Sequence, residues 1–209
     1  MESRVISAFL LMFAMVAVAP ALHARGRKAP ASTEPGSYKE WGPDIDEMQI
    51  LKSFKIANYD RVVVLPFDSS ATPMPDKDDN SYAATKSVLA GYSDTLVEAL
   101  RPELKAPLKV ETADKAPRTA KTLIIRGKVD EMNPGSRAAR MWAGYGAGAA
   151  GSKVTGEIVD AKSGEVLAKF TQARRSGGSF KFGGGDYTAV MRDSIHATGQ
   201  DIAHMLDMF

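Results

Sequence analysis

The sequence predicts an α+β fold, in which an antiparallel-rich mixed sheet carries helices packed mainly on one face. Three observations predict it. Residues 61–67 form a β-branched run, residues 153–170 alternate as a two-strand hairpin does, and residues 82–100 and 187–209 repeat apolar side chains every three or four positions. Taken along the chain, these patterns give the order β-α-β-β-β-β-α, roughly, for a single domain over residues 59–209.

The N-terminal segment, residues 1–24, has the pattern of a secretory signal peptide. One arginine lies within the first four residues, and residues 5–19 are almost wholly apolar before Pro20. A membrane-spanning helix needs about 20 apolar residues, so this shorter run favours a cleaved signal, with cleavage after Ala21 or Ala24. The chain contains no cysteine, which a bacterial lipoprotein would need at its cleavage point. We therefore expect a periplasmic or secreted protein that is not a lipoprotein.

Residues 25–58 are predicted to be a linker with a short helix. The stretch up to Pro43 is rich in proline and charged residues, and it carries too little apolar surface to offset its ordering entropy. Over residues 44–56 the apolar side chains are spaced nearly as in a helix, with Asp44 placed to cap it.

The domain is predicted to open with a strand over residues 61–67, since a continuous β-branched run suits a covered strand. The loop that follows contains a D-x-D-x-N pattern, but Ser81 and Ser87 stand where a calcium loop needs its turn glycine and its bidentate glutamate. Calcium binding is therefore not expected. The next helix, residues 82–100, has one apolar stripe and ends at Pro102.

The remaining elements follow from local patterns. Short apolar runs predict strands at residues 108–112 and 122–132. Alternation over residues 153–170 is interrupted by the turn residues 160–164, which predicts a β-hairpin. The last helix, residues 187–209, has the clearest apolar stripe of the chain and follows Asp186, a good capping residue.

Two segments are candidate interaction surfaces. In the first, residues 137–151, arginines lie beside aromatic residues. Such an arrangement can hold a carboxylate, phosphate or sugar, or can form structural cation–π contacts. The second, residues 174–185, mixes basic, aromatic and glycine residues, as surfaces that bind single-stranded nucleic acid, proteins or membranes do. The near-zero net charge of +2 argues against nucleic acid. The candidate residues are Arg137, Arg140, Trp142, Tyr145, Arg174, Arg175, Phe180 and Lys181.

No catalytic, cofactor or metal residues are predicted. Residues 146–151 spell GxGxxG, but they lead into a strand, whereas a dinucleotide site needs a helix there. His196 and His204 are eight residues apart, about 12 Å along a helix, which is too far to share a zinc ion. No nucleophile elbow accompanies them. We therefore expect that the protein is not an enzyme.

Three motifs resemble those of a known family. The stretch N-P-G-S-R-A-A-R at residues 133–140, the glycine run at residues 144–151 and the V-D-x-x-S-G-E turn at residues 159–165 are similar to the DUF4410 family of bacterial envelope proteins. The resemblance covers roughly residues 60–209. It implies an exported α+β domain without known activity, distantly similar in fold to domains of the curli secretion channel and of the lipoprotein activators of penicillin-binding proteins.

These observations favour an exported, non-enzymatic interaction or assembly-accessory domain of the bacterial cell envelope, whose partner is another envelope protein. Two alternatives stay open. The Gly/Ala-rich segment could make a membrane-associating or oligomerising module, although membrane association is not required. Alternatively, Arg137, Arg140 and Trp142 could bind a small anion or a glycan. The sequence fixes neither the partner nor the oligomeric state.

Overall fold

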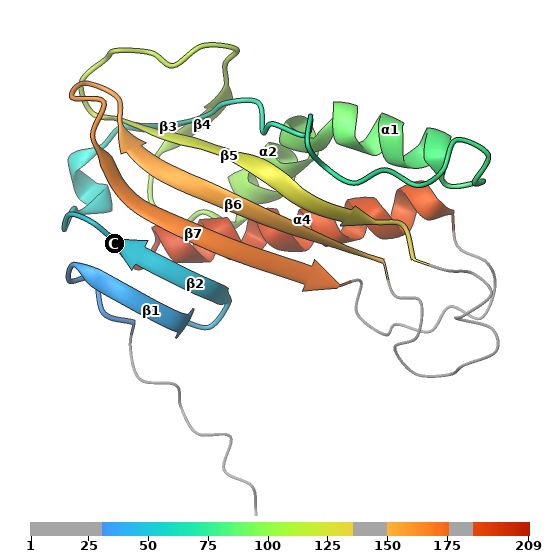
Figure 1. Cartoon of the computed structure of the whole chain (residues 1–209). Coiled ribbons are helices and arrows are strands. Elements are labelled where there is room, and N and C mark those ends of the chain that lie inside the picture. Colours follow the sequence, from blue (N-terminus) through green and yellow to red (C-terminus); the bar gives the residue numbers. More distant parts are fainter. Residues whose placement is uncertain (1–30, 136–149, 176–185) are drawn as a thin grey trace, which may run out of the picture.

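The computed structural model describes residues 31–135, 150–175 and 186–209. In this part of the chain, a seven-stranded sheet has the order β1-β2-β7-β6-β5-β3-β4 (Figure 1). The strands are β1 (Gly36–Trp41), β2 (Ile45–Ile50), β3 (Arg61–Val64), β4 (Lys109–Thr112), β5 (Thr122–Asn133), β6 (Gly151–Asp160) and β7 (Val166–Arg175). The helices are α1 (Tyr82–Ala90), α2 (Tyr92–Glu103) and α4 (Tyr187–Leu206), with a short 3₁₀ turn at Ile56–Asn58.

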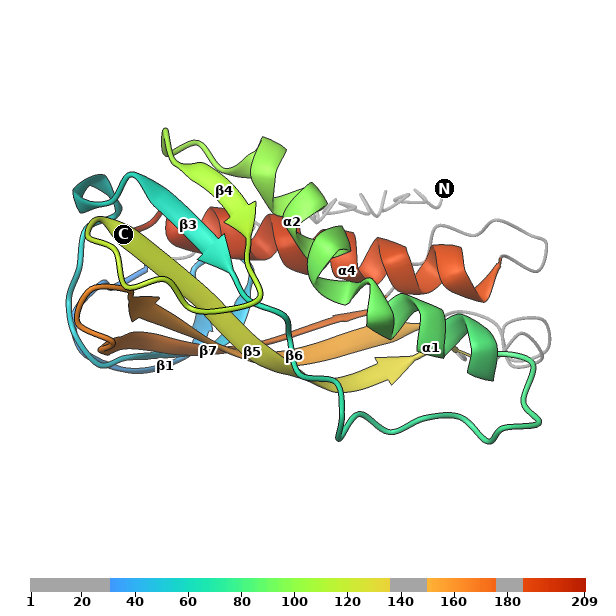
Figure 2. The same cartoon turned by 90° about the horizontal axis from the view of Figure 1, so that it is seen from above.

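The sheet is mixed but mostly antiparallel, which confirms the predicted fold class. Strand β3 runs parallel to β4 and β5, and the four other strand pairs are antiparallel. Helices α1, α2 and α4 all cover the same face of the sheet (Figure 2). The opposite face, which we call the open face, carries no described helix.

The main core lies between the sheet and its helices. In β5, Leu123 and Ile125 belong to this core, whereas Ile124 belongs to a small second cluster on the open face. Such alternation is what a strand with one covered face produces, because successive side chains point to opposite sides.

The predicted hairpin over residues 153–170 is present as β6 and β7, joined by a turn in which Gly164 has a positive φ of 76°. Within it, Gly156 lies opposite Phe170 across the two strands. A Cβ atom at Gly156 would come within 2.3 Å of the Phe170 ring, so the ring occupies the space that any other residue would fill. The large buried ring thus requires a glycine on the neighbouring strand.

The prediction of a linker with a short helix is wrong for residues 36–50, which form the β1–β2 hairpin. Strand β2 extends the sheet beyond β7, where Met48 pairs with Phe170 and Ile50 with Ala168. The spacing of the apolar side chains in β2 is compatible with a helix as well as a strand. Pairing with β7 stabilises the strand. The aromatic ring of Phe209 stacks on Trp41 at 5.2 Å and so ties the hairpin to the end of the chain.

The two predicted helices are present, with one change. The helix expected over residues 82–100 is divided at Gly91 into α1 and α2, and α2 continues one residue past Pro102. Helix α4 begins as predicted, with the Asp186 carboxylate accepting a hydrogen bond from the Thr188 amide.

Candidate functional site

A shallow hollow of about 510 Å³ lies at one end of the open face. It forms where β5 ends and β6 begins, because Gly151 and Ala173 have small or absent side chains while their neighbours are long. A Cβ atom at Gly151 would lie 2.8 Å from the Arg174 carbonyl oxygen, so the small residue is required there. The lining residues are Asp46, Glu47, Glu131, Asn133, Gly151, Ser152, Lys153, Thr171, Ala173, Arg174 and Arg175.

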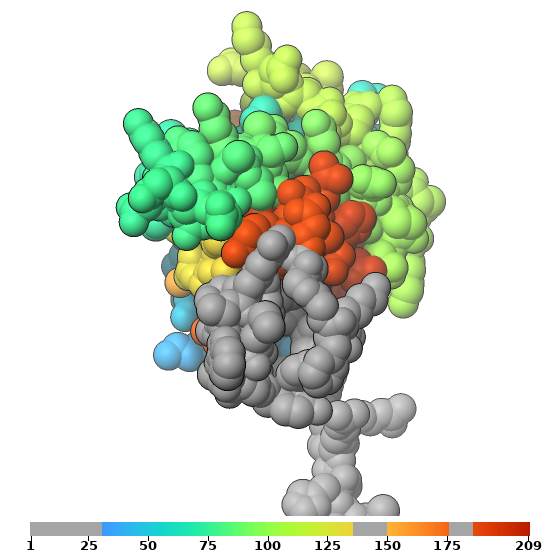
Figure 3. Space-filling model, turned by 90° about the vertical axis from the view of Figure 1, so that its right-hand side faces the viewer, coloured from blue at the N-terminus to red at the C-terminus, as the bar shows by residue number. Residues whose placement is uncertain are grey.

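Figure 3 shows this end of the molecule, where the end of β5 (yellow) lies beside α1 (green) and the start of α4 (red). Strand β5 leads from here into residues 136–149, and β7 leads into residues 176–185. The hollow therefore lies where the two predicted interaction segments join the sheet.

In the middle of the open face, charged side chains on neighbouring strands pair with one another. Glu157 forms ion pairs with Arg126 at 2.8 Å and with Lys169 at 3.2 Å. Lys128 pairs with Asp130 at 3.2 Å, and the hydroxyl of Thr155 donates to the same carboxylate. Cross-strand neighbours of opposite charge are the usual way in which a solvated sheet face is stabilised.

At the hollow the pattern changes. Lys153 and Arg175 project from neighbouring strands, and Glu47 and Glu131 flank them on β2 and β5. Within the described residues, none of these four side chains forms an ion pair. Among the described residues, the hollow therefore offers charges of both signs that no other side chain pairs with.

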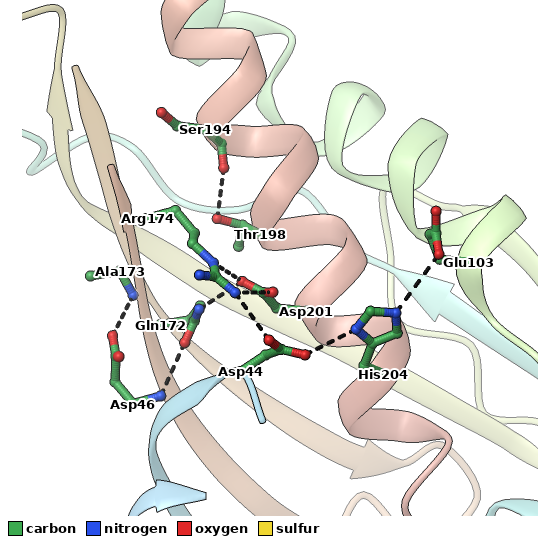
Figure 4. Close-up of polar contacts among 10 residues, drawn as sticks. All are labelled: Asp44, Asp46, Glu103, Gln172, Ala173, Arg174, Ser194, Thr198, Asp201 and His204. Atoms are coloured by element: carbon green, nitrogen blue, oxygen red, sulfur yellow. Dashed lines mark hydrogen bonds and ion pairs between the residues drawn. The ribbon is translucent and has the colours of Figure 1, made fainter. Parts of the chain in front are cut away.

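Beneath the hollow, on the helix side of the sheet, lies a buried ion pair. Asp201 of α4 is 3% exposed, and Arg174 of β7 donates to its two carboxylate oxygens from Nε and Nη2 (Figure 4). The side-chain amide of Gln172 donates to the same carboxylate at 2.7 Å. Burial raises the pKa of Asp201, and the bonds from Arg174 and Gln172 oppose that rise.

The ion pair extends into a network that joins four parts of the fold. Asp44, in the turn between β1 and β2, lies 3.3 Å from the Arg174 guanidinium and 3.0 Å from Nδ1 of His204. On its other side, His204 places Nε2 3.7 Å from the carboxylate of Glu103, at the end of α2 (Figure 4). We call Arg174, Asp201, Gln172, Asp44, His204 and Glu103 the Arg174 cluster. It connects the β1–β2 hairpin with β7, α4 and α2.

The predicted interaction residues divide into two groups. Arg174 and Arg175 are adjacent on β7 but point to opposite faces, so that Arg174 is held in the cluster and Arg175 lies on the open face. The other six, Arg137, Arg140, Trp142, Tyr145, Phe180 and Lys181, lie outside the described residues.

The sequence prediction missed Asp201, Asp44 and Lys153. One signal was present for Asp201, because it falls on the apolar stripe of α4 between Thr198 and Met205. A carboxylate at such a position needs a buried partner, and this would have suggested an arginine. No comparable local signal marks Asp44 or Lys153.

The described part of the chain shows no constellation for metal chemistry. No three His, Cys, Asp or Glu side chains among these residues gather as ligands for a metal ion. Similarly, of the helices in the described ranges, none is long and apolar enough to cross a membrane. What the arrangement can do chemically is offer hydrogen bonds and charges of both signs on a solvent-facing surface.

Comparisons with known proteins identify a family and remote structural likenesses. The family model described as "Domain of unknown function (DUF4410)" matches residues 62–177. No curated protein matches the chain.

Among solved structures, the PelC dodecamer from Paraburkholderia phytofirmans is 17% identical, covering 74% of this chain and 96% of that chain with a TM-score of 0.44. Protein XCC0632 from Xanthomonas campestris, of the DUF330 family, is 13% identical, covering 83% and 93% with a TM-score of 0.38. Because both TM-scores are below 0.5, we draw no functional conclusion from these two structures.

Proposed function

The chain belongs to the DUF4410 family, whose function is unknown, and from its own surface we propose that it is an exported, non-enzymatic interaction module of the bacterial cell envelope. In this proposal residues 1–24 direct export and are removed. The domain then acts in the periplasm or outside the cell by binding another envelope protein through the hollow on its open face.

One observation carries the proposal: within the described residues, four charged side chains that line the hollow form no ion pair, whereas those in the middle of the open face are paired. Lys153 and Arg175 supply two cations on adjacent strands, and Glu47 and Glu131 supply anions on either side. Complementary charges on a partner would steer its approach and fix its orientation, which is what polar interfaces achieve.

The nature of the lining also favours a protein partner over a small apolar ligand. Sites for small molecules are mostly concave and apolar, with few polar groups. This hollow is open to solvent, and its lining contains six charged residues. Such a surface resembles the polar rim of a protein interface more than a ligand pocket.

The test is capture of the partner from two sets of cross-linked cells. One set expresses the unaltered chain, and the other expresses a variant with Lys153→Gln and Arg175→Gln. We expect an envelope protein to be captured by the unaltered chain and its recovery to fall at least about tenfold in the variant, the effect of about 1.4 kcal/mol of lost affinity.

The matched control carries Lys162→Gln and Arg118→Gln. Both residues line a second shallow depression elsewhere on the molecule and form no ion pair within the described ranges. This control changes the net charge equally, so it should leave capture unchanged. Equal recovery by both variants would contradict the proposed surface, and turnover of an envelope substrate that is abolished by a single side-chain change would contradict the non-enzymatic role.

A further inference from the structure

Within the described residues, the last part of β7 has an edge beside the hollow that pairs with no other strand. On one side β7 pairs with β6 as far as Arg175, but on the other side its pairing with β2 ends at Thr171. Strand β7 therefore extends past the start of β2 (Figure 1). Ala173 and Arg175 are exposed there, and both line the hollow. We call residues 173–175 the free edge.

The main-chain groups of the free edge point away from the sheet. A Cβ atom at Gly151 would lie 2.8 Å from the Arg174 carbonyl oxygen, so this carbonyl points toward β6. Alternate residues of a paired strand direct their N–H and C=O groups to opposite sides, so those of Ala173 and Arg175 point away from β6. The Ala173 amide shows this direction, because it donates at 2.7 Å to the carboxylate of Asp46 (Figure 4). That carboxylate stands where the carbonyl group of a neighbouring strand would lie.

The two outer edges of the sheet are protected against the addition of a strand. In β1 the regular backbone is interrupted by Glu40, whose φ is 50°, next to the charged Lys39. In β4 the carbonyl of Val110 accepts a hydrogen bond from Arg101 of α2. Irregular backbone, charged side chains and covered main-chain groups are the usual means of protecting an edge. At the free edge, the Asp46 carboxylate covers one main-chain amide.

We infer that an extended segment of the partner protein adds to the sheet as a strand along the free edge and displaces the Asp46 carboxylate from the Ala173 amide. Main-chain hydrogen bonds hold such a strand, and its side chains provide selectivity. The hollow of about 510 Å³ gives the segment room beside β7. That the segment belongs to an envelope protein rests on the proposed function, whereas strand addition itself does not.

The charges around the free edge favour an acidic residue in the added strand. Arg175 points to the open face at the edge, and Lys153 lies on β6 opposite Ala173. The anions are less well placed to oppose this, because Glu131 lies on β5, further from the edge, and Glu47 lies beside Thr171. A carboxylate on the added strand opposite Arg175 therefore meets a cation, and opposite charges on neighbouring strands stabilise their pairing.

The test is an NMR titration of the exported protein with three capped pentapeptides. The first, Thr-Val-Glu-Val-Thr, favours an extended backbone and carries one carboxylate. The second has lysine in place of glutamate. The third is the first peptide with the nitrogens of its central residues methylated, so that they cannot donate hydrogen bonds. We expect the first peptide to shift the amide signals of Ala173 and Arg175 and to bind about threefold more tightly than the second. The methylated peptide should shift neither signal.

Variants separate the main chain from the side chains. Arg175→Pro removes the amide that faces the free edge and should abolish binding of the glutamate and lysine peptides. Arg175→Gln keeps this amide and removes the charge, so both peptides should bind with equal affinity. Asp46→Ala removes the group that competes for the Ala173 amide and should strengthen binding of the lysine peptide about threefold. Charge attraction alone would instead weaken it, since an anion is lost.

An unshifted Arg175 amide at about 5 mM glutamate peptide, above the millimolar affinity expected of so short a segment, would overturn the inference. Equal shifts with the methylated peptide would also overturn it. Because the titration needs no cellular partner, its outcome is separate from the capture experiment. Peptide binding by a protein that captures nothing would support strand addition and contradict the proposed function. Capture that depends on Lys153 and Arg175, without any peptide shift, would support the proposed function and contradict strand addition.

Discussion

Removing Arg174 should expose the dependence of the fold on the buried ion pair. In Arg174→Met the aliphatic stem is kept and the guanidinium is lost, so Asp201, 3% exposed, retains only the bond from Gln172. Leaving one member of a buried pair without its partner costs about 3–5 kcal/mol. The Arg174 side chain is 35% exposed, so water screens part of the interaction, and we expect a loss of about 2–3 kcal/mol in the free energy of unfolding.

Arg175→Met is the matched control, because it removes the same side chain from the next residue, which points to the open face and forms no ion pair within the described residues. We expect it to change stability by less than about 0.5 kcal/mol. Urea unfolding at pH 7 measures both variants. The midpoint for Arg174→Met should fall by about 1 M with an unchanged slope.

A second variant tests whether the cost arises from the unpaired charge. Adding Asp201→Asn to Arg174→Met replaces the buried carboxylate by a neutral amide and should recover about half of the loss. Acid should also reduce the deficit of Arg174→Met. Burial raises the pKa of Asp201 and no guanidinium then opposes it, so its ionisation destabilises the folded state at neutral pH, and this penalty disappears as pH falls through the folded pKa. Equal midpoints for the two single methionine variants would refute this reasoning.

Two further predictions concern the sheet. Gly156→Ala should lower the free energy of unfolding by about 1–3 kcal/mol, measured in urea, because its Cβ would lie 2.3 Å from the Phe170 ring. The control is Gly91→Ala, whose Cβ has no atom nearer than 3.9 Å and which should change stability by less than about 1 kcal/mol. Similar losses in both variants would contradict the packing argument. Burial and the carboxylate of Asp160, which accepts a hydrogen bond from the Tyr59 hydroxyl, raise the pKa of Tyr59 to about 12. The resulting stabilisation is complete below pH 10 and is lost as pH rises through 12. Ultraviolet titration should therefore show this late ionisation, and Tyr59→Phe should weaken the alkaline fall in stability. A Tyr59 titration near pH 10 would contradict the second prediction.

The local patterns in the sequence predict the centre of the fold well. The apolar run within residues 122–132 and the alternation over residues 153–170 are local signals, and the structure has both segments as strands of one sheet. In the same way, the apolar stripe and the Asp186 cap identify α4. Signals of this kind are contained within one element or two consecutive ones, so no distant partner is needed to interpret them.

The β1–β2 hairpin could not be predicted in that way. Strand β1 lies at the edge of the sheet, and its exposed Ser37, Lys39 and Glu40 carry no apolar alternation. Its neighbour β2 becomes a strand by pairing with β7, more than a hundred positions later in the chain. Composition alone made this segment resemble a linker, and tertiary pairing overrides that tendency.

The candidate site likewise combines residues that local patterns identify with contacts that depend on distant parts of the chain. Arg174 and Arg175 are identified from sequence as a basic pair, but their opposite roles depend on which face of β7 is covered. Asp44 and His204 are 160 positions apart in the sequence, and no local pattern indicates that they are in contact. Asp201 is the exception, because a carboxylate on the apolar stripe of a helix already indicates a buried partner.

Site-specific photo-crosslinking at Lys153 tests the central claim most directly. A photoreactive amino acid is placed at this position in the hollow and, as a control, at Lys162 in the turn between β6 and β7, at the other end of the same strand. Our account predicts that irradiation of living cells joins the chain to one envelope protein from position 153 and not from position 162. The same adducts from both positions, or none from position 153, would contradict the assignment of the hollow as the binding surface.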